Sequence, residues 1–92
     1  MRVGIPTKVV FVYGEGSQTI GRLETVSRTG GCVGMEAQLA ESTLVHVQMR
    51  TLTGTITGVA EMLTPVGRGR QPFRFIAMDE MDVRRLEQFV TQ

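Results

Sequence analysis

The chain has 92 residues, of which 41% are hydrophobic and 21% charged, and its formal net charge is +1. Its length suits one domain with a modest core, and its composition is that of a folded protein rather than a disordered one. The small net charge argues against a general nucleic-acid binder, which needs several phosphate contacts at once.

The sequence predicts a cytoplasmic protein that is not inserted in a membrane. No apolar run approaches the roughly 20 residues of a membrane helix, and no signal-peptide pattern opens the chain. Cys32 is the only cysteine, which excludes a disulfide framework and a cysteine metal cluster and suits a reducing compartment. Because it opens a predicted strand, we expect Cys32 to be partly buried and unreactive.

Short runs of β-branched, aromatic and alternating residues, separated by glycine-rich or polar turns, predict a mainly β protein. The predicted strands are residues 8–13, 18–26, 32–35, 44–50, 54–63 and 73–78. Residues 1–7 are expected to be an irregular lead-in, because Gly4 and Pro6 both resist a helix. Residues 66–72 are expected to form a flexible basic loop at a solvated hairpin tip, with a ligand-contacting role as the alternative.

The last predicted element is a helix at residues 79–91. Asp79 can cap it, and Glu80 and Asp82 lie in the first turn, where the helix dipole favours anions. The apolar residues that recur on one face at helical spacing are Val83, Leu86, Phe89 and Val90. Packing of this face against the strands predicts a small six-stranded antiparallel β-barrel with one C-terminal α-helix.

A polar, glycine-containing segment joins the second and third predicted strands. Its sequence, Ser27-Arg28-Thr29-Gly30-Gly31, predicts a tight turn, because glycine accepts a positive φ at no steric cost. Ser27 can hydrogen bond to the backbone of such a turn, and free N–H groups there would form a concave anion site. On the local sequence alone, a simple hairpin connection is the preferred interpretation.

No catalytic site is predicted. Ser27 and His46 are the one nucleophile–base pair to consider, and no acid is placed to orient them. With a single histidine and a single cysteine, no metal site is expected either. The aromatic residues are expected in the core rather than as a stacking platform for nucleic acid; they are Phe11, Tyr13, Phe73, Phe75 and Phe89.

The segment around Ser27 resembles the second signature of PilZ domains, which reads Asp/Asn-x-Ser-x-x-Gly. Ser27 and Gly30 fill the last two defined positions, and Thr25 stands where the family has a carboxylate or an amide. The order of predicted strands and the closing helix also fits the family's layout over nearly the whole chain. The resemblance implies a single PilZ-like domain at residues 1–92, a bacterial receptor for the second messenger cyclic di-GMP, with no other cofactor.

The second ligand element of the family is an Arg-x-x-x-Arg segment before the first strand. Arg2 aligns best with its second arginine, and the first would lie before Met1. Arginine suits this ligand because it can form paired hydrogen bonds with phosphate and stack on guanine. By resemblance, the nucleotide-binding residues are Arg2, Thr25, Ser27, Arg28 and Gly30.

Two functions remain open at this point. The resemblance favours a cyclic di-GMP receptor. The incomplete arginine element and Thr25 favour a PilZ-like barrel that does not bind the nucleotide and instead docks to a protein partner or to other domains of a longer chain. A charge-assisted hydrogen bond contributes about 1.5–3 kcal/mol, so the loss of one arginine would weaken nucleotide binding by roughly one to two orders of magnitude.

Overall fold

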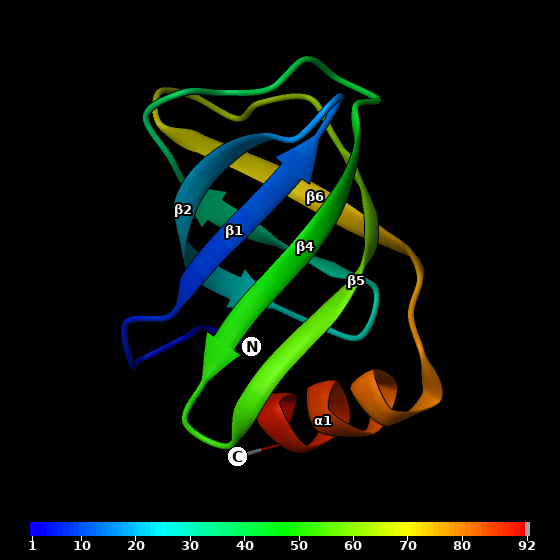
Figure 1. Cartoon of the computed structure of the whole chain (residues 1–92). Coiled ribbons are helices and arrows are strands. Elements are labelled where there is room, and N and C mark those ends of the chain that lie inside the picture. Colours follow the sequence, from blue (N-terminus) through cyan, green and yellow to red (C-terminus); the bar gives the residue numbers. More distant parts are fainter. Residues whose placement is uncertain (92) are drawn as a thin grey trace.

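The structure is a computed structural model that describes residues 1–91. Its elements are β1 (Lys8–Tyr13), β2 (Ser17–Val26), β3 (Gly30–Gly34), β4 (Leu44–Thr51), β5 (Gly54–Met62), β6 (Arg70–Ala77) and α1 (Glu80–Val90). The strands form a closed barrel in the order β1-β2-β3-β6-β5-β4, and all neighbouring strands are antiparallel. Figure 1 shows α1 at the end of the barrel where the β4–β5 turn and the N-terminus lie. The predicted barrel with its C-terminal helix is confirmed.

Two strands begin at least two residues earlier than the sequence predicts. β3 begins at Gly30 rather than at residue 32, and β6 begins at Arg70 rather than at residue 73. Gly30 pairs with Arg74 and Gly34 with Arg70, so the two early starts belong to one continuous ladder. The loop prediction is therefore wrong for residues 70–72. Pro72 lacks an N–H group, but its carbonyl still accepts a hydrogen bond from the Leu63 N–H at 3.0 Å.

Inward-facing side chains from all six strands fill the barrel. The largest fully buried apolar ones are Phe11, Phe73, Met49, Ile56, Met62, Val9, Val26, Val33, Val45 and Val47. Phe73 packs edge-to-face against Phe11 and Phe75, with ring centroids 5.6 and 5.4 Å apart. Tyr13, Phe75 and Phe89 are only partly buried against this core. Met81 on α1 lies outside the core and is 59% exposed.

One polar side chain is also fully buried. Gln71 accepts a hydrogen bond from the Leu39 N–H at 2.9 Å and donates to the Leu39 and Leu63 carbonyls at 2.7 and 3.0 Å. Because each polar atom has a partner, its burial carries little penalty. Gln71 thereby fastens the loop at residues 35–43 to the barrel end opposite α1 (Figure 1).

The helix presents most of its predicted face to the barrel. Leu86 is 2% exposed, and Phe89 and Val90 are partly buried against the core. Val83 is the exception at 38% exposed, and Asp82, predicted to stabilise the helix dipole, is buried instead. The Asp82 carboxylate accepts hydrogen bonds from the Thr57 N–H at 3.0 Å and the Thr57 hydroxyl at 3.3 Å. The pairing between β5 and β6 begins at Val59, so Thr57 has no partner on β6. Its N–H therefore needs the Asp82 carboxylate as an acceptor. Asp79 occupies the N-cap position without a side-chain capping hydrogen bond.

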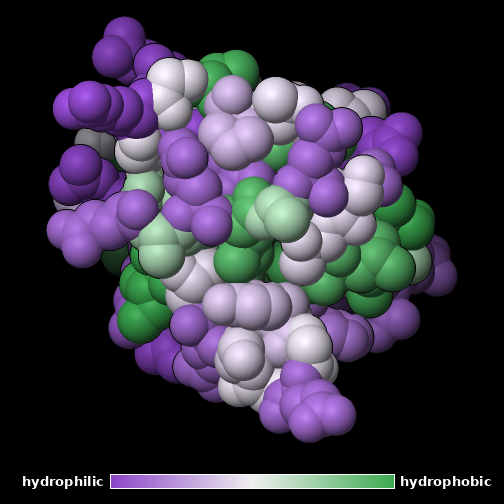
Figure 2. Space-filling view, turned by 90° about the horizontal axis from the view of Figure 1, so that it is seen from above, coloured by the Kyte–Doolittle hydropathy of each residue, from purple (hydrophilic) through white to green (hydrophobic). Residues whose placement is uncertain are grey.

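The surface gives no sign of a membrane-spanning or metal-binding element within the part of the chain that the structure describes. α1 is neither long nor apolar enough to cross a bilayer. Across residues 1–91, no three His, Cys, Asp or Glu side chains gather in a way that could hold a metal ion. Figure 2 views the barrel from the end that carries the β1–β2 turn. Hydrophobic side chains there form separate groups among hydrophilic ones.

Candidate functional site

The turn between β2 and β3 is built by Ser27, as the sequence predicts. The Ser27 N–H donates to the Gly30 carbonyl at 2.7 Å. The Ser27 hydroxyl accepts a hydrogen bond from the Thr29 N–H at 3.3 Å and lies 3.1 Å from the Thr29 hydroxyl. The Thr29 carbonyl in turn accepts the Phe75 N–H at 2.8 Å, which fixes the turn to β6. The segment is therefore a rigid, polar corner at the edge of the barrel wall.

The two glycines after this turn are needed for a reason other than the predicted one. Neither Gly30 nor Gly31 is among the glycines with a positive φ. A Cβ atom on Gly30 would lie 2.1 Å from the Phe73 carbonyl oxygen, and one on Gly31 would lie 2.4 Å from the Thr25 carbonyl oxygen. The prediction of a left-handed turn is wrong. Both positions require glycine because neighbouring backbones approach too closely for any side chain.

The N-terminal segment lies along the part of β2 that β1 does not cover. β1 pairs with β2 as far as the Lys8–Arg22 pair. Beyond it, the Val3 N–H donates to the Glu24 carbonyl at 2.8 Å, and Arg2 and Thr25 form an isolated antiparallel bridge. Bridge partners point their side chains to the same side of a sheet. Arg2 is therefore held beside Thr25 on the outer face of the barrel.

Thr25 lies between two depressions on this outer face. One, of about 790 Å³, is lined by Arg2, Arg22, Glu24 and Arg70 together with residues 3–6. The other, of about 320 Å³, is lined mainly by residues of the Ser27 turn and of β6; they include Ser27, Thr29, Gly30, Gly31, Phe73 and Arg74. Thr25 lines both depressions. The structure thus brings four predicted residues, Arg2, Thr25, Ser27 and Gly30, to one continuous surface.

Arg28, the fifth predicted residue, lies elsewhere. Its side chain is 70% exposed, and its guanidinium is 4.0 Å from the Glu87 carboxylate of α1. It lines neither of the two depressions beside Thr25. The turn thus presents Ser27 and Thr29 to the barrel wall and Arg28 to the helix.

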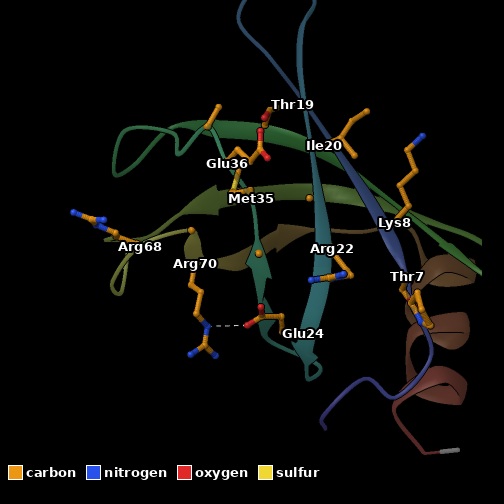
Figure 3. Close-up of a pocket in the computed structure, with 15 residues that line it drawn as sticks. Thr7, Lys8, Thr19, Ile20, Arg22, Glu24, Met35, Glu36, Arg68 and Arg70 are labelled. Carbon is orange, nitrogen blue, oxygen red and sulfur yellow. Dashed lines mark hydrogen bonds and ion pairs between the residues drawn. The ribbon is translucent and has the colours of Figure 1, made fainter.

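Three arginines on this surface were not predicted as site residues. Arg22, Arg70 and Arg74 come from β2 and β6. The β2–β3–β6 register brings Arg74 beside the Ser27 turn, opposite Gly30, whereas Arg22 and Arg70 flank Gly34 at the other end of β3. The Arg70 Nε atom lies 2.8 Å from the Glu24 carboxylate, and an Arg74 Nη atom lies 2.6 Å from the Glu61 carboxylate. Figure 3 shows the first of these ion pairs. The only sequence signal was the acid-free stretch that holds Arg70 and Arg74.

Gly34 allows the first ion pair to form across an intervening strand. Gly34 on β3 lies between Arg22 on β2 and Arg70 on β6 in the register. A Cβ atom on Gly34 would lie 3.0 Å from a Glu24 carboxylate oxygen, so this carboxylate lies over the glycine to reach Arg70. Exposed ion pairs contribute about 1 kcal/mol or less. An anionic ligand can therefore displace Glu24 from Arg70 at small cost.

Solved structures of other proteins share the fold of this chain, although the sequence comparisons found no match. No protein-family model and no curated protein matches the sequence. The solved structures that match its fold include the following two. One is YcgR from Escherichia coli in complex with c-di-GMP, with a TM-score of 0.84 and 19% identity over 99% of this chain. The other is the PilZ domain of CeSA from a cellulose synthesizing bacterium, with a TM-score of 0.77 and 23% identity. The chain has the PilZ fold.

The extent of the two matches differs. This chain covers 42% of the YcgR chain, whereas it covers 99% of the CeSA PilZ domain and is itself covered completely. The PilZ fold therefore accounts for the whole chain, from the N-terminal segment to α1.

Proposed function

We propose that this PilZ-fold chain is a bacterial, cytoplasmic receptor domain for cyclic di-GMP and not an enzyme. One observation carries the proposal. Arg2, Thr25 and the Ser27 turn form one outer surface of a barrel whose fold matches part of YcgR, a protein solved with c-di-GMP bound. The ligand would lie over Thr25 and reach into both depressions.

The groups on this surface suit the chemistry of the ligand. Cyclic di-GMP carries two phosphates and two guanine bases, and guanidinium groups can bind the former and stack on the latter. Arg2 and Arg22 line the same depression, and neither forms an ion pair within residues 1–91. Arg22 would supply a second guanidinium beside Arg2. Ser27 and Thr29 would hold a phosphate or a guanine edge at the other depression.

Titration calorimetry with cyclic di-GMP tests this function directly. We expect binding heat with the wild-type chain, a weaker response as salt rises because phosphate contacts are screened, and no comparable response to GMP. Arg84→Ala, on the exposed side of α1, serves as the matched control for loss of an arginine. An absence of binding heat at millimolar cyclic di-GMP would reject the receptor function for this chain.

The competing function is docking to a protein partner without the nucleotide. One observation favours it: the threonine at position 25 accepts fewer hydrogen bonds than a carboxylate. Under this alternative the outer surface beside Thr25 would be a contact surface only. The same calorimetric titration separates the two functions, because only the receptor produces heat with cyclic di-GMP.

A further inference from the structure

Three basic side chains form one transverse row on the barrel wall, which spans four neighbouring strands with a glycine on the third. Lys8 on β1 is opposite Arg22 on β2, Arg22 is opposite Gly34 on β3, and Gly34 is opposite Arg70 on β6. We call Lys8, Arg22 and Arg70 the basic row. All three are exposed, and Figure 3 shows them along one stretch of the wall, with Arg68 extending from the loop before β6.

The basic row carries a repulsion that the described part of the barrel does not neutralise. Like charges directly opposite one another on adjacent strands destabilise a sheet. Lys8 and Arg22 are such a pair, and neither forms an ion pair within residues 1–91. Glu24 is turned toward Arg70 instead. An anion from outside the chain would relieve the repulsion, so the row is suited to bind one.

The surface over the basic row is long and only partly polar. Its depression measures about 900 Å³, and the lining contains four basic residues against two acidic ones. Neighbouring strands lie about 4.8 Å apart, so the distance from β1 to β6 is roughly 14 Å, which an extended peptide of four or five residues spans. Ile20, 55% exposed, adds an apolar contact at the same depression. An extended peptide would contact the full length of the row and also Ile20. A small inorganic anion would do neither.

We propose that the basic row binds an extended acidic segment of a protein partner. Acidic side chains of that segment would lie at Lys8 and Arg22, and an apolar one would lie at Ile20. In one respect the proposal rests on the proposed receptor function. Arg22 and Arg70 line both this depression and the one beside Arg2. Cyclic di-GMP and the acidic segment therefore compete for the same guanidinium groups, and the nucleotide releases the partner.

A labelled peptide can test the docking site without knowledge of the natural partner. The probe is a fluorescein-labelled synthetic peptide of glutamate and leucine, and its control has glutamine in place of glutamate. We expect the fluorescence anisotropy of the glutamate peptide to rise with the wild-type chain and Lys8→Glu to weaken this binding about tenfold or more, because charged hydrogen bonds are lost and repulsion is added. Arg50→Glu makes the same charge change on the exposed side of β4, and it should leave binding nearly unchanged.

Lys8→Glu is a safe substitution because it places opposite charges in the Lys8–Arg22 pair. Its melting temperature should equal or exceed that of the wild type. Equal loss of peptide binding in Lys8→Glu and Arg50→Glu would overturn the proposal in favour of general electrostatic attraction. Binding of inorganic tripolyphosphate that depends on Lys8, without binding of the glutamate peptide, would overturn it in favour of a small-anion site.

The competition and the receptor function fail in different ways. Lys8 does not line the depression beside Arg2, so Lys8→Glu should affect peptide binding far more than cyclic di-GMP binding. Peptide binding that depends on Lys8, in a chain that gives no heat with cyclic di-GMP, would support the docking site and reject the receptor. Nucleotide binding without peptide binding would do the reverse. If both ligands bind and neither weakens the other, the competition is refuted.

Discussion

The two sides of this barrel differ in how their outer surfaces are completed. On β5, the N–H of Thr57 is bonded by Asp82 of α1, and Leu86 of the same helix is buried beside it. On β2, β3 and β6, the outer surface carries Arg2, Arg22, Arg70 and Arg74 around glycines. On the first side, which we call the helix side, α1 supplies the hydrogen-bond partner of the β5 backbone. On the second, which we call the arginine side, two guanidinium groups form no ion pair within residues 1–91.

This difference indicates on which side of the barrel a bound ligand would add stability to the folded chain. A ligand on the helix side would have to displace a buried carboxylate from two hydrogen bonds. On the arginine side it would meet free guanidinium groups and, at Arg70 and Arg74, exposed ion pairs that contribute about 1 kcal/mol or less. A substitution on the helix side should therefore change stability and spare ligand binding. A substitution of one of these arginines should weaken ligand binding and leave stability nearly unchanged.

The largest effect is expected where the arginine side depends on backbone contact. In Gly30→Val, the new Cβ atom would lie 2.1 Å from the Phe73 carbonyl oxygen, so β3 and β6 must separate. We expect a loss of roughly 3 kcal/mol of unfolding free energy, which lowers the melting temperature by about 10–20 °C. Gly4→Val is the matched control, because no heavy atom lies within 4 Å of the corresponding Cβ position. Equal melting temperatures for the two variants would contradict this close approach.

The sequence was sufficient for features that depend on local pattern. Alternation placed β4 within one residue of its observed end, because Val45, Val47 and Met49 face the core. The turn chemistry of Ser27 was also predictable, since its partners Thr29 and Gly30 are its neighbours in sequence. Local pattern was enough in these cases because the interactions themselves are local.

Features that depend on the barrel register could not be predicted from the sequence. The need for glycine at position 30 comes from Phe73, more than forty residues away in sequence. Likewise, Arg22 and Arg70 lie in one row of the barrel wall only because both are opposite Gly34. Helical spacing predicted Val83 toward the core, but the free N–H of Thr57 brought Asp82 there instead. In each case a residue on a strand distant in sequence decides the outcome.

The next largest effect is expected on the helix side. Asp82→Ala leaves the Thr57 N–H without its acceptor, and hydrogen bonds to a charged group contribute about 1.5–3 kcal/mol. We expect chemical denaturation to show a loss of about 2 kcal/mol with unchanged affinity for cyclic di-GMP below the transition. Glu80→Ala is the control, because Glu80 is exposed on the same helix turn. A large loss of nucleotide affinity in Asp82→Ala would break the separation of the two sides.

A smaller free-energy change is expected from single arginines, and it should appear in affinity rather than in stability. Arg2→Ala removes a guanidinium from the depression beside Thr25 and should weaken cyclic di-GMP binding about tenfold, or ~1.4 kcal/mol. Arg28→Ala removes one that faces Glu87 and should weaken it much less. Calorimetry on both variants, with Arg84→Ala alongside, measures the difference. A greater loss in Arg28→Ala than in Arg2→Ala would place the ligand nearer the helix side.

The smallest effect concerns Cys32, which reports on the arginine side without disturbing it. Cys32 pairs with Thr25 and Pro72 across β3, so its side chain lies on the same face of the sheet as Thr25, where it is partly buried. Its reaction with iodoacetamide should be slower in the native chain than in the urea-unfolded chain, because partial burial limits access to the thiol. Saturating cyclic di-GMP should slow it further, since a ligand lying over Thr25 also covers Cys32. The Arg2→Ala variant should need more nucleotide for the same protection. If protection is absent while calorimetry shows binding, the nucleotide lies away from Thr25, and the two sides of the barrel must be compared again with the ligand placed elsewhere.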